Sequence, residues 1–286
     1  MYKSMTILDK IKHFIPDKIY LKMQYWYHFK KILNLNNPKT FNEKIQWLKL
    51  YDRKPEYTQF ADKYEVRKYI KETIGEKYLI PLIGVYDNVD DIDWNSLPNK
   101  FVLKCTHGSQ CNIICKDKTK LDIEESKKKL RKWINRNWYW YGREWPYKNI
   151  KPRIICEKYM VDESGVELKD YKIFCFNAIP RIIQVDFNRF TDHKRNFYDI
   201  NWRFIDVSLK YPSYPNITIE KPRKLDTILR FAKILSYNTL FSRIDFYSIN
   251  ERVYFGEITF FPESGFGKFS SSNFDLLLGS WINLSH

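Results

Sequence analysis

Two acidic side chains near the C-terminal end of the chain have a spacing that suits cation binding on a β-hairpin. Asp245 and Glu257 lie in the apolar runs Ser242–Ile249 and Val253–Phe261, which alternate as strands do. If residues 250–252 form a three-residue loop, the two acids face each other with Cβ atoms about 5 Å apart. Two like charges at that distance favour a bound cation, such as Mg²⁺ held through oxygen and bridging to phosphates. A loop of two or four residues shifts the register and places the acids on opposite faces.

A second pattern places a lysine at the end of an apolar run, with a polar loop directly after it. Lys104 belongs to the run Phe101–Cys105, and His107, Gly108 and Ser109 follow. Such a loop binds phosphate when its backbone N–H groups surround the oxygens and the lysine supplies a positive charge. A lysine at a strand end is also commonly solvated, so the pattern alone leaves both interpretations open.

Two further runs carry polar groups on apolar strands. Alternation sets Asp170 and Lys172 on one face with two phenylalanines, so Lys172 needs an anion nearby, either a phosphate or Asp170 itself. The run Arg153–Asp162 leads an apolar strand into an acidic, aromatic segment. Backbone groups in that hinge are suited to bind an adenine edge, although a strand that simply leaves the core has the same pattern.

The elements that must position these residues are helices in the first part of the chain and short strands after it. Thr40 with Glu43 and Asp62 with Glu65 form capping boxes that begin helices, and Leu8 and Ile11 start a run with helical spacing. Long helices that alternate with hairpin-like strands favour an α+β fold with antiparallel sheets. The predicted helices cover residues 20–33, 41–51, 63–71, 123–140 and 224–235, and the strands 80–85, 101–105, 112–115, 153–158, 171–176, 181–186, 196–198, 242–249 and 253–261.

Composition bounds the class of protein. The chain has 286 residues, of which 44% are hydrophobic, so it has enough apolar surface for a buried core and wholesale disorder is excluded. Its 49 basic and 34 acidic residues give a formal net charge of +15. That excess favours an anionic partner, such as nucleotide phosphates, nucleic acid, acidic lipid or an acidic saccharide.

The cysteines and the apolar runs indicate where the protein works. Five cysteines scattered through apolar runs predict buried free thiols of a reducing compartment, although Cys105, His107, Cys111 and Cys115 lie close enough in sequence to raise a zinc site. No apolar run approaches the ~20 residues that span a bilayer, and residues 1–33 lack the apolar segment of a signal peptide. We therefore expect a cytoplasmic protein. The basic, aromatic segment Ile19–Leu33 predicts a helix packed on the body or, as an alternative, a helix on a membrane surface.

Taken in order, these stretches resemble the TupA-like (teichuronopeptide-type) ATP-grasp family of bacterial cell-surface polysaccharide biosynthesis. The likeness extends from Asn37 to Gly267. It rests on the segments Asn37–Lys44, Ala61–Arg67, Phe101–Gln110, Glu157–Tyr159, Asp170–Lys172, Arg243–Asp245 and Gly256–Phe260.

The resemblance implies an ATP-grasp fold, with two α+β lobes whose antiparallel sheets grip ATP. Residues 1–95 would form a helical N-terminal section, 96–163 the first lobe and 164–286 the second. Arg243 and Lys172 would be catalytic, with Arg243 stabilising the acyl phosphate and the oxyanion. Asp245, Glu257 and Thr259 would hold Mg²⁺, with Thr259 standing where the family usually has Asn. The residues expected to bind ATP are Lys63, Lys104, His107, Gly108, Ser109, Glu157, Lys158, Tyr159, Met160, Asp162 and Lys172.

The activity that the resemblance implies is ATP-dependent ligation. A carboxylate, from an acidic sugar or peptide, would be activated as an acyl phosphate and joined to an amine. A glycosyltransferase of surface polysaccharide assembly is the alternative, but the D-x-D match, Asp91–Asp93, lies in the acidic run Asp90–Asp93, which is typical of an acidic loop. An RNA-binding role for the aromatic cluster at Trp133–Tyr141 is disfavoured, because aromatics at a helix end more often form core or cleft wall.

Overall fold

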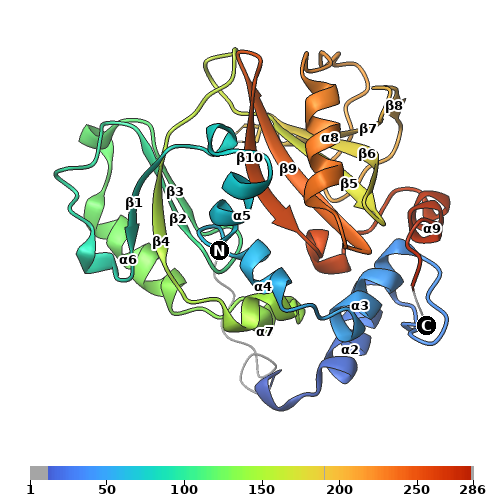
Figure 1. Cartoon of the computed structure of the whole chain (residues 1–286). Helices are drawn as coiled ribbons and strands as arrows, with labels where there is room; N and C mark the ends of the chain where they lie inside the picture. Colours follow the sequence, from blue (N-terminus) through green and yellow to red (C-terminus); the bar gives the residue numbers. More distant parts are fainter. Residues whose placement is uncertain (1–11, 190, 285–286) are drawn as a thin grey trace.

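The computed structural model describes residues 12–189 and 191–284. Two antiparallel sheets stand on either side of a central space, and helices close its lower end in the view of Figure 1. The architecture is α+β, as predicted. Leu8 and Ile11, which we expected to begin a helix, lie outside the described residues.

The smaller sheet has four strands in the order β1-β4-β2-β3. Alternation in β2 buries Phe101 and Leu103 against Leu130 of the helix α6 (Ile123–Ile134) and turns Lys104 to the opposite face. β1 lies within residues 1–95, so this sheet draws on both sides of the predicted boundary at residue 95. The strands are β1 (Leu82–Tyr86), β2 (Phe101–Cys105), β3 (Asn112–Cys115) and β4 (Ile154–Lys158).

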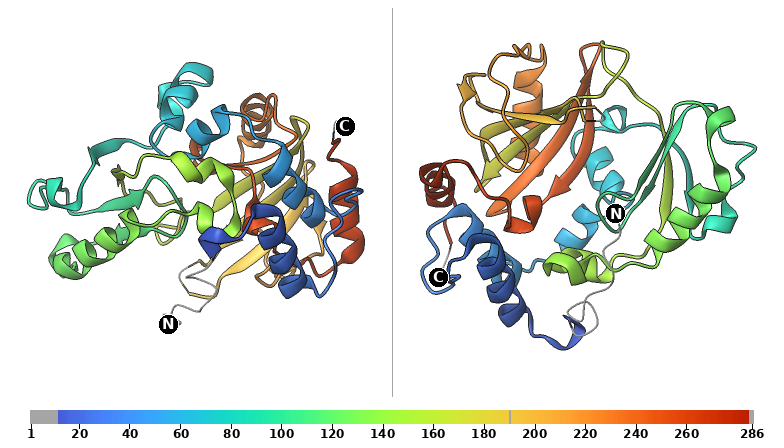
Figure 2. Two further views of the ribbon diagram at one scale, coloured as in Figure 1. Left: turned by 90° about the horizontal axis from the view of Figure 1, so that it is seen from below. Right: turned by 180° about the vertical axis from the view of Figure 1, so that it is seen from behind.

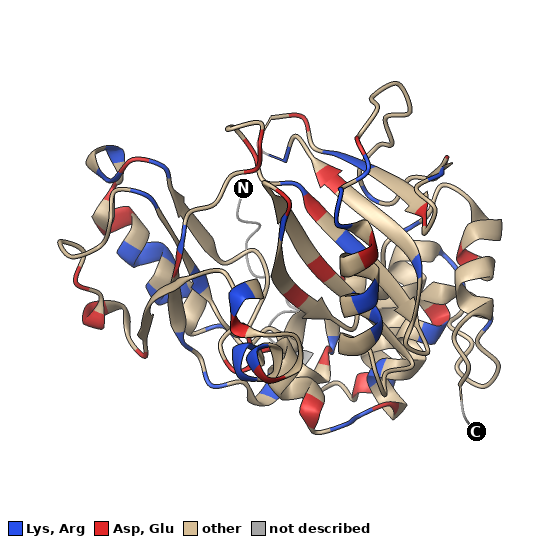
Figure 3. Cartoon of the chain, turned by 45° about the horizontal axis from the view of Figure 1, so that its top comes forward, with Lys and Arg blue, Asp and Glu red and all other residues tan. Residues whose placement is uncertain are grey.

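The larger sheet has six strands in the order β10-β9-β5-β6-β7-β8. Helix α8 (Leu225–Leu235) packs on one face, where Ile228 is buried with Ile183 and Ile244. The other face is apolar at one end and charged at the other, and Figure 3 shows both signs of charge along its strands. The strands are β5 (Asp170–Phe176), β6 (Ile179–Phe187), β7 (Lys194–Asp199), β8 (Phe204–Ile205), β9 (Phe241–Ile249) and β10 (Arg252–Thr259).

The N-terminal helices pack onto the apolar end of the larger sheet. Thr40 and Glu43 form the predicted capping box and begin α3 (Phe41–Tyr51), whose Phe41 ring lies 4.9 Å from the ring of Phe241. Figure 2 shows α3 beside α9 (Ser272–Ser280), far apart in sequence. The other N-terminal elements are η1 (Lys12–Phe14), α2 (Asp17–Phe29), α4 (Glu56–Ala61) and α5 (Val66–Thr73).

Three predicted helices differ from the structure in their boundaries. The first, predicted over residues 20–33, is α2, which begins earlier; it also ends earlier, because Lys30 adopts a left-handed φ and ends it. The carboxylate of Asp62 accepts from the backbone N–H of Tyr64 at 2.8 Å and so closes a turn, and α5 begins only at Val66. The helix predicted over residues 123–140 is broken after α6, because Asn137 accepts from the N–H of Tyr139 and starts a separate turn. The remaining short elements are η2 (Glu76–Tyr78), η3 (Val89–Asp91), η4 (Lys118–Lys120), α7 (Tyr139–Gly142), η5 (Trp145–Asn149) and η6 (Pro262–Gly265).

A buried lysine fixes the segment that follows β10. Glu263, Ser264 and Gly265 all have left-handed φ angles, of 48°, 54° and 62°, which is costly for the two residues that carry a Cβ. The Nζ atom of Lys49 donates to the carbonyl oxygens of Ser264 and Gly142, each at 2.7 Å. These bonds tie α3, α7 and η6 together at the lower end of the central space.

The five cysteines are free and buried, as predicted. In the part of the chain that the structure describes, no group of three or more His, Cys, Asp or Glu side chains is placed to hold a metal ion, so the zinc alternative has no support there. No helix among the described residues is long and apolar enough to cross a bilayer.

Candidate active site between the two sheets

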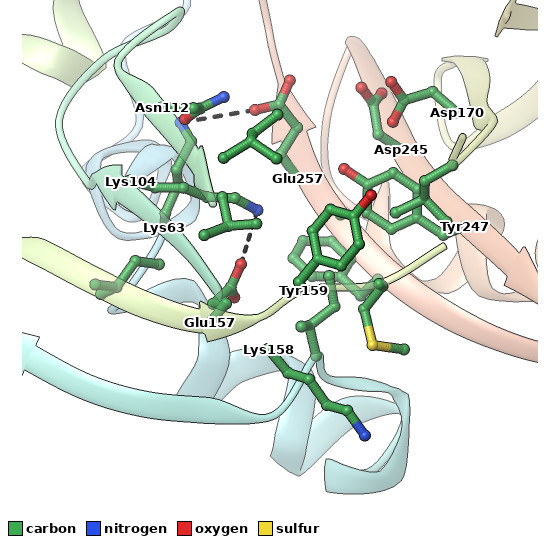
Figure 4. A pocket seen from close by; sticks show the side chains of 18 of the residues that line it. Lys63, Lys104, Asn112, Glu157, Lys158, Tyr159, Asp170, Asp245, Tyr247 and Glu257 are labelled. Carbon is green, nitrogen blue, oxygen red and sulfur yellow. Dashed lines mark hydrogen bonds and ion pairs between the residues drawn. The ribbon is translucent and has the colours of Figure 1, made fainter. Parts of the chain in front are cut away.

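A cavity of about 270 Å³ lies between the charged end of the larger sheet and the inner face of the smaller one (Figure 4). Apolar side chains line part of the cavity, with Val102 and Ile155 from the smaller sheet and Phe255 from the larger. Tyr159 and Met160, just after β4, line it as well. Apolar and aromatic side chains beside the end of a strand suit a flat aromatic ring such as a nucleobase.

Basic side chains of the smaller lobe gather around Glu157 at the cavity wall. The Nζ atom of Lys104 lies 2.7 Å from one carboxylate oxygen of Glu157, and a guanidinium nitrogen of Arg67 lies 3.0 Å from the other. Glu157 therefore acts as the partner that fixes two cations. Figure 4 shows Lys104 reaching into the cavity from β2, with its ammonium group on Glu157.

Lys63 connects the two sheets. Its Nζ atom donates to the carbonyl oxygen of Gly108 at 2.7 Å and lies 3.7 Å from a carboxylate oxygen of Glu257 on β10. Its backbone N–H donates to the carbonyl of Thr106, at the end of β2. The loop after β2 is thus attached to the segment before α5, and the Lys63 charge is placed at the centre of the site.

The hairpin of β9 and β10 pairs Asp245 with Glu257, as predicted, but by a different geometry. The loop has two residues, Asn250 and Glu251, both with left-handed φ angles. That loop alone would have placed the acids on opposite faces. A bulge at Gly256 shifts the register by one and restores the pairing. A Cβ at Gly256 would lie 3.0 Å from the carbonyl oxygen of Asp245, so glycine permits this close approach.

Two cations neutralise Asp245. Arg243 donates to both of its carboxylate oxygens, each at 2.7 Å, and the Nζ atom of Lys172 lies 2.5 Å from one of them. Asp245 is 1% exposed, so these contacts form a buried ionic cluster. Burial raises the pKa of Asp245, and the two cations oppose that shift. The repulsion between Asp245 and Glu257 still raises the pKa of Asp245, but Arg243, which also lies 3.2 Å from Glu257, and Lys172 offset it.

Glu257 is the acid that faces the cavity. Its side chain keeps 36% of its surface exposed, and one of its oxygens lies 3.3 Å from the hydroxyl of Thr259. Burial would raise the pKa of Glu257, but the lysine and arginine charges around it, Lys63 first, lower the pKa to about 2. Two carboxylates and a hydroxyl on one strand pair form an all-oxygen donor set, which fits Mg²⁺ completed by phosphate oxygens.

Comparisons with known proteins decide which family these features belong to. The model of the family described as TupA-like ATPgrasp matches residues 43–283. The chain belongs to the TupA-like ATP-grasp family. The resemblance stated from the sequence is thereby confirmed, and the two antiparallel sheets are those of an ATP-grasp protein.

Solved structures with similar folds are remote from this TupA-like protein in sequence. D-alanine–D-alanine ligase from Helicobacter pylori is 16% identical, with 85% of this chain and 69% of that chain covered and a TM-score of 0.42. Phosphoribosylamine–glycine ligase from Thermotoga maritima is 12% identical, with coverages of 73% and 50% and a TM-score of 0.41. The ATP-grasp ligase PsnB, complexed with minimal precursor, Mg and ADP, is 9% identical, with coverages of 77% and 57% and a TM-score of 0.38. The chain spans little more than half the length of the last two. No curated protein sequence matches it.

Most of the residues expected to bind ATP or metal in this TupA-like protein border the cavity. Arg243 and Thr259 lie directly behind Asp245 and Glu257. The roles of all these residues stay predictions. Those that line the cavity are Lys63, Lys104, Ser109, Glu157, Lys158, Tyr159, Met160, Lys172, Asp245 and Glu257.

Three of the residues expected to bind ATP, His107, Gly108 and Asp162, are not part of the cavity lining. His107 is buried, with Nε2 3.2 Å from the carbonyl oxygen of Trp133, because the chain turns after β2 and directs the ring towards the end of α6. The carbonyl oxygen of Gly108 accepts from Lys63. Asp162 binds its own loop, where it accepts from Ser164 and from Lys169 at 2.9 Å, so it is not directed at a ribose.

Other residues near the hinge have these positions. The side chain of Lys158 is exposed and points away from the cavity in Figure 4, which leaves its backbone for the predicted hinge. Glu163, next to Asp162, accepts from the backbone N–H of Asn250. Glu167 lines the cavity and accepts from the N–H of Asn188 at 2.7 Å.

Sequence reasoning missed several charged residues of the site. Arg67 and Arg189 line the cavity, and Arg189 pairs with Asp170, which also lies 3.5 Å from Lys172. Arg67 could have been predicted, because it is the last residue of Ala61–Arg67, one of the segments on which the family resemblance rests. Arg189 follows a strand by two residues and has no pattern of its own, so its position could come only from the fold.

Proposed function

We propose that the protein is an ATP-dependent ligase that forms an amide from a carboxylate and an amine. The observation that carries the proposal is the position of Glu257 opposite Lys63 and Lys104, in a cavity that apolar and aromatic side chains suited to a nucleobase also line. Phosphates attached to a base held there would reach this cluster. Membership of an ATP-grasp family supports ATP as the nucleotide.

The proposed reaction has two steps. A carboxylate oxygen of the substrate attacks the γ-phosphorus of ATP, and the bond to the β–γ bridging oxygen breaks, which gives an acyl phosphate and ADP. The amine nitrogen then attacks the acyl carbon, inorganic phosphate leaves and the nitrogen loses a proton. Lys63, Lys104 and Lys172 would orient the phosphates and offset their charge. Arg243 would stabilise the oxyanion with its fixed pair of donors.

Mg²⁺, when bound, would be held by Glu257, Asp245 and Thr259 and would neutralise charge on the transferred phosphoryl group. For Asp245 to contribute, its bond to Lys172 must be exchanged, because both of its oxygens are occupied in this structure. Lysine and arginine side chains from both sheets would thus face the phosphates. Glu157 holds Lys104 in place, and Asp245 holds Lys172.

The biological setting belongs to the same proposal. We expect the carboxylate to come from an acidic sugar or peptide of a capsule, O-antigen or cell-wall polysaccharide, and the reaction to occur in the cytoplasm. The likeness to a family of surface-polysaccharide genes supports this setting, and the net charge of +15 suits an acidic substrate.

The glycosyltransferase alternative gains no support from the acidic run at residues 90–93. Asp90 pairs with Arg131, Asp91 accepts from the N–H of Asn88 and Asp93 accepts from the N–H of Asn95. All three lie away from the cavity, and each has a structural role.

A hydroxylamine assay tests the ligase proposal. With ATP, Mg²⁺ and a panel of uronic acids and acidic peptides, we expect ADP to form only when a suitable carboxylate is present. Added hydroxylamine should then yield a hydroxamate, because it intercepts the acyl phosphate. Release of UDP or GDP from sugar nucleotides without any need for ATP would contradict the proposal.

Lys104→Met should weaken ATP binding at least ~10-fold, because the substitution removes a charge that faces phosphate and keeps most of the stem. Lys100→Met is the matched control, since Lys100 lies just before β2 with its side chain exposed, and the affinity of this variant should stay within about twofold of the parent. Isothermal titration calorimetry measures both. Equal affinities for the two variants would show that the phosphates lie elsewhere.

A further inference from the structure

The outer face of α2 carries large apolar side chains that are exposed to solvent. Ile19, Met23, Trp26 and Tyr27 recur at helical spacing and keep 53%, 44%, 56% and 64% of their surface exposed. The opposite face of α2 is also apolar and packs on the body through buried side chains such as Leu21. The helix is thus apolar on two sides, and its contacts with the body account for only one of them.

Two further exposed apolar side chains flank α2. Phe14, just before the helix, is 86% exposed, and Ile32, just after it, is 85% exposed. In Figure 1 α2 lies at the lower edge of the molecule, away from the region between the sheets. We call these six exposed side chains the α2 ridge. A ridge of aromatic and aliphatic groups this size is unusual on a surface that only water contacts.

Basic side chains accompany the α2 ridge. Lys18 and Lys22 lie one turn apart along α2, and Lys30 and Lys31 follow the end of the helix. The Nζ atom of Lys30 lies 4.7 Å from the centre of the Trp26 ring. Within the described ranges, neither Lys18 nor Lys22 forms an ion pair with an acidic side chain.

A hollow beside the ridge brings two of these lysines together with amide groups. It is lined by Lys18 and Lys22 from α2 and by Asn34 and Asn36 from the segment that follows, with Ile32 at its rim. Ammonium and amide N–H groups are donors to the oxygens of a phosphate. A hollow with the donors to bind an anion thus lies beside the α2 ridge.

We propose that the α2 ridge docks on the surface of an anionic lipid bilayer. The apolar side chains would enter the boundary between headgroups and acyl chains, and the hollow would receive a lipid phosphate. Trp and Tyr beside Lys are the side chains that favour this boundary. The net charge of +15 adds a long-range attraction to an anionic leaflet. The proposal does not depend on the ligase activity, because the cavity between the sheets remains open to solvent.

Sedimentation with vesicles tests the docking on the full chain. We expect binding to vesicles of phosphatidylcholine with about one third phosphatidylglycerol, weak binding to phosphatidylcholine alone, and loss of binding at high salt. The emission of Trp26 should shift to shorter wavelength on binding, because the indole leaves water. Equal binding to both vesicles, or to neither, would overturn the proposal.

Matched variants locate the contact. Trp26→Ala and the pair Lys18→Gln/Lys22→Gln should each weaken vesicle binding at least ~10-fold, because they remove the anchor and the headgroup contacts. Tyr237→Ala and the pair Lys128→Gln/Lys221→Gln change equally exposed side chains elsewhere and should bind as the parent does. Thermal melts confirm that each variant is folded. If sedimentation equilibrium shows a dimer that Trp26→Ala dissociates, the ridge is an interface between two copies and the membrane proposal is wrong.

Discussion

Asp245→Asn is expected to lower the free energy of unfolding by about 3 kcal/mol, because it removes one partner from a buried ionic cluster. Arg243 and Lys172 are 8% and 6% exposed, and without the Asp245 charge both lose their closest anion. Turnover should also be lost, since the same carboxylate fixes the two predicted catalytic cations. Urea denaturation and ADP release measure the two effects separately.

The double variant Asp245→Asn/Lys172→Met is the control for this prediction. Removal of one negative and one positive charge restores the charge balance, so the double variant should regain part of the lost stability while turnover stays absent. Stability equal to or above the parent for Asp245→Asn alone would mean that the repulsion between the two acids outweighs the attraction of Arg243 and Lys172.

Glu257→Gln is expected to lower the free energy of unfolding by less than Asp245→Asn does, and to reduce Mg²⁺-dependent turnover ~100-fold or more. The side chain of Glu257 is 36% exposed, and the nearest lysine, Lys63, keeps a hydrogen bond to Gly108 when the charge is removed. Turnover falls because an oxygen ligand of the expected metal becomes a neutral amide.

The control for Glu257→Gln is Glu72→Gln, the same change on the exposed surface of α5, which should leave both quantities as in the parent. A large loss of stability for Glu257→Gln, with turnover lost only in proportion to folded protein, would assign Glu257 a structural role instead.

The pH dependence of the Glu257 contribution follows from its pKa of about 2, which lies below the ordinary value of 4.5. A carboxyl group whose pKa is lowered in the folded state stabilises the fold above its unfolded pKa, and this contribution is lost as the pH falls through the folded pKa. The contribution of Glu257 should thus be complete above about pH 4.5 and decline towards pH 2. Glu257 therefore stays ionised between pH 8 and pH 5. Any decrease in the turnover of the parent over this range should also occur in Glu257→Gln.

The pairing of Asp245 with Glu257 shows how far the sequence can be interpreted without a structure. Strand boundaries came from alternation and were close to those observed, since apolar side chains must face the core at every second position. The two-residue loop and the bulge were not predicted, because a turn and a bulge act over one or two residues and leave the alternation nearly unchanged. The acids were paired correctly because these two differences cancel.

His107 and Asp162, whose side chains the structure directs away from the cavity, are both in loops. His107 and Asp162 stand beside strands that were located correctly, yet their directions depend on turns that local hydrogen bonds determine. Lys104 and Lys172, which lie within strands, were placed on the correct face. Their partners could not be predicted, because Lys104 meets Glu157 through a pairing of β2 with β4, 53 residues apart in sequence.

The bulge at Gly256 has a consequence for how this hairpin can vary between species. A three-residue loop without a bulge and a two-residue loop with one contain the same number of residues and pair the same two acids. A lineage can therefore exchange one form for the other by substitution alone, with no insertion or deletion. If either the bulge at Gly256 or the two-residue loop changed alone, one of the two carboxylates would point to the opposite face of the sheet. We expect homologues to preserve the number of residues between the two acids more strictly than the residues themselves.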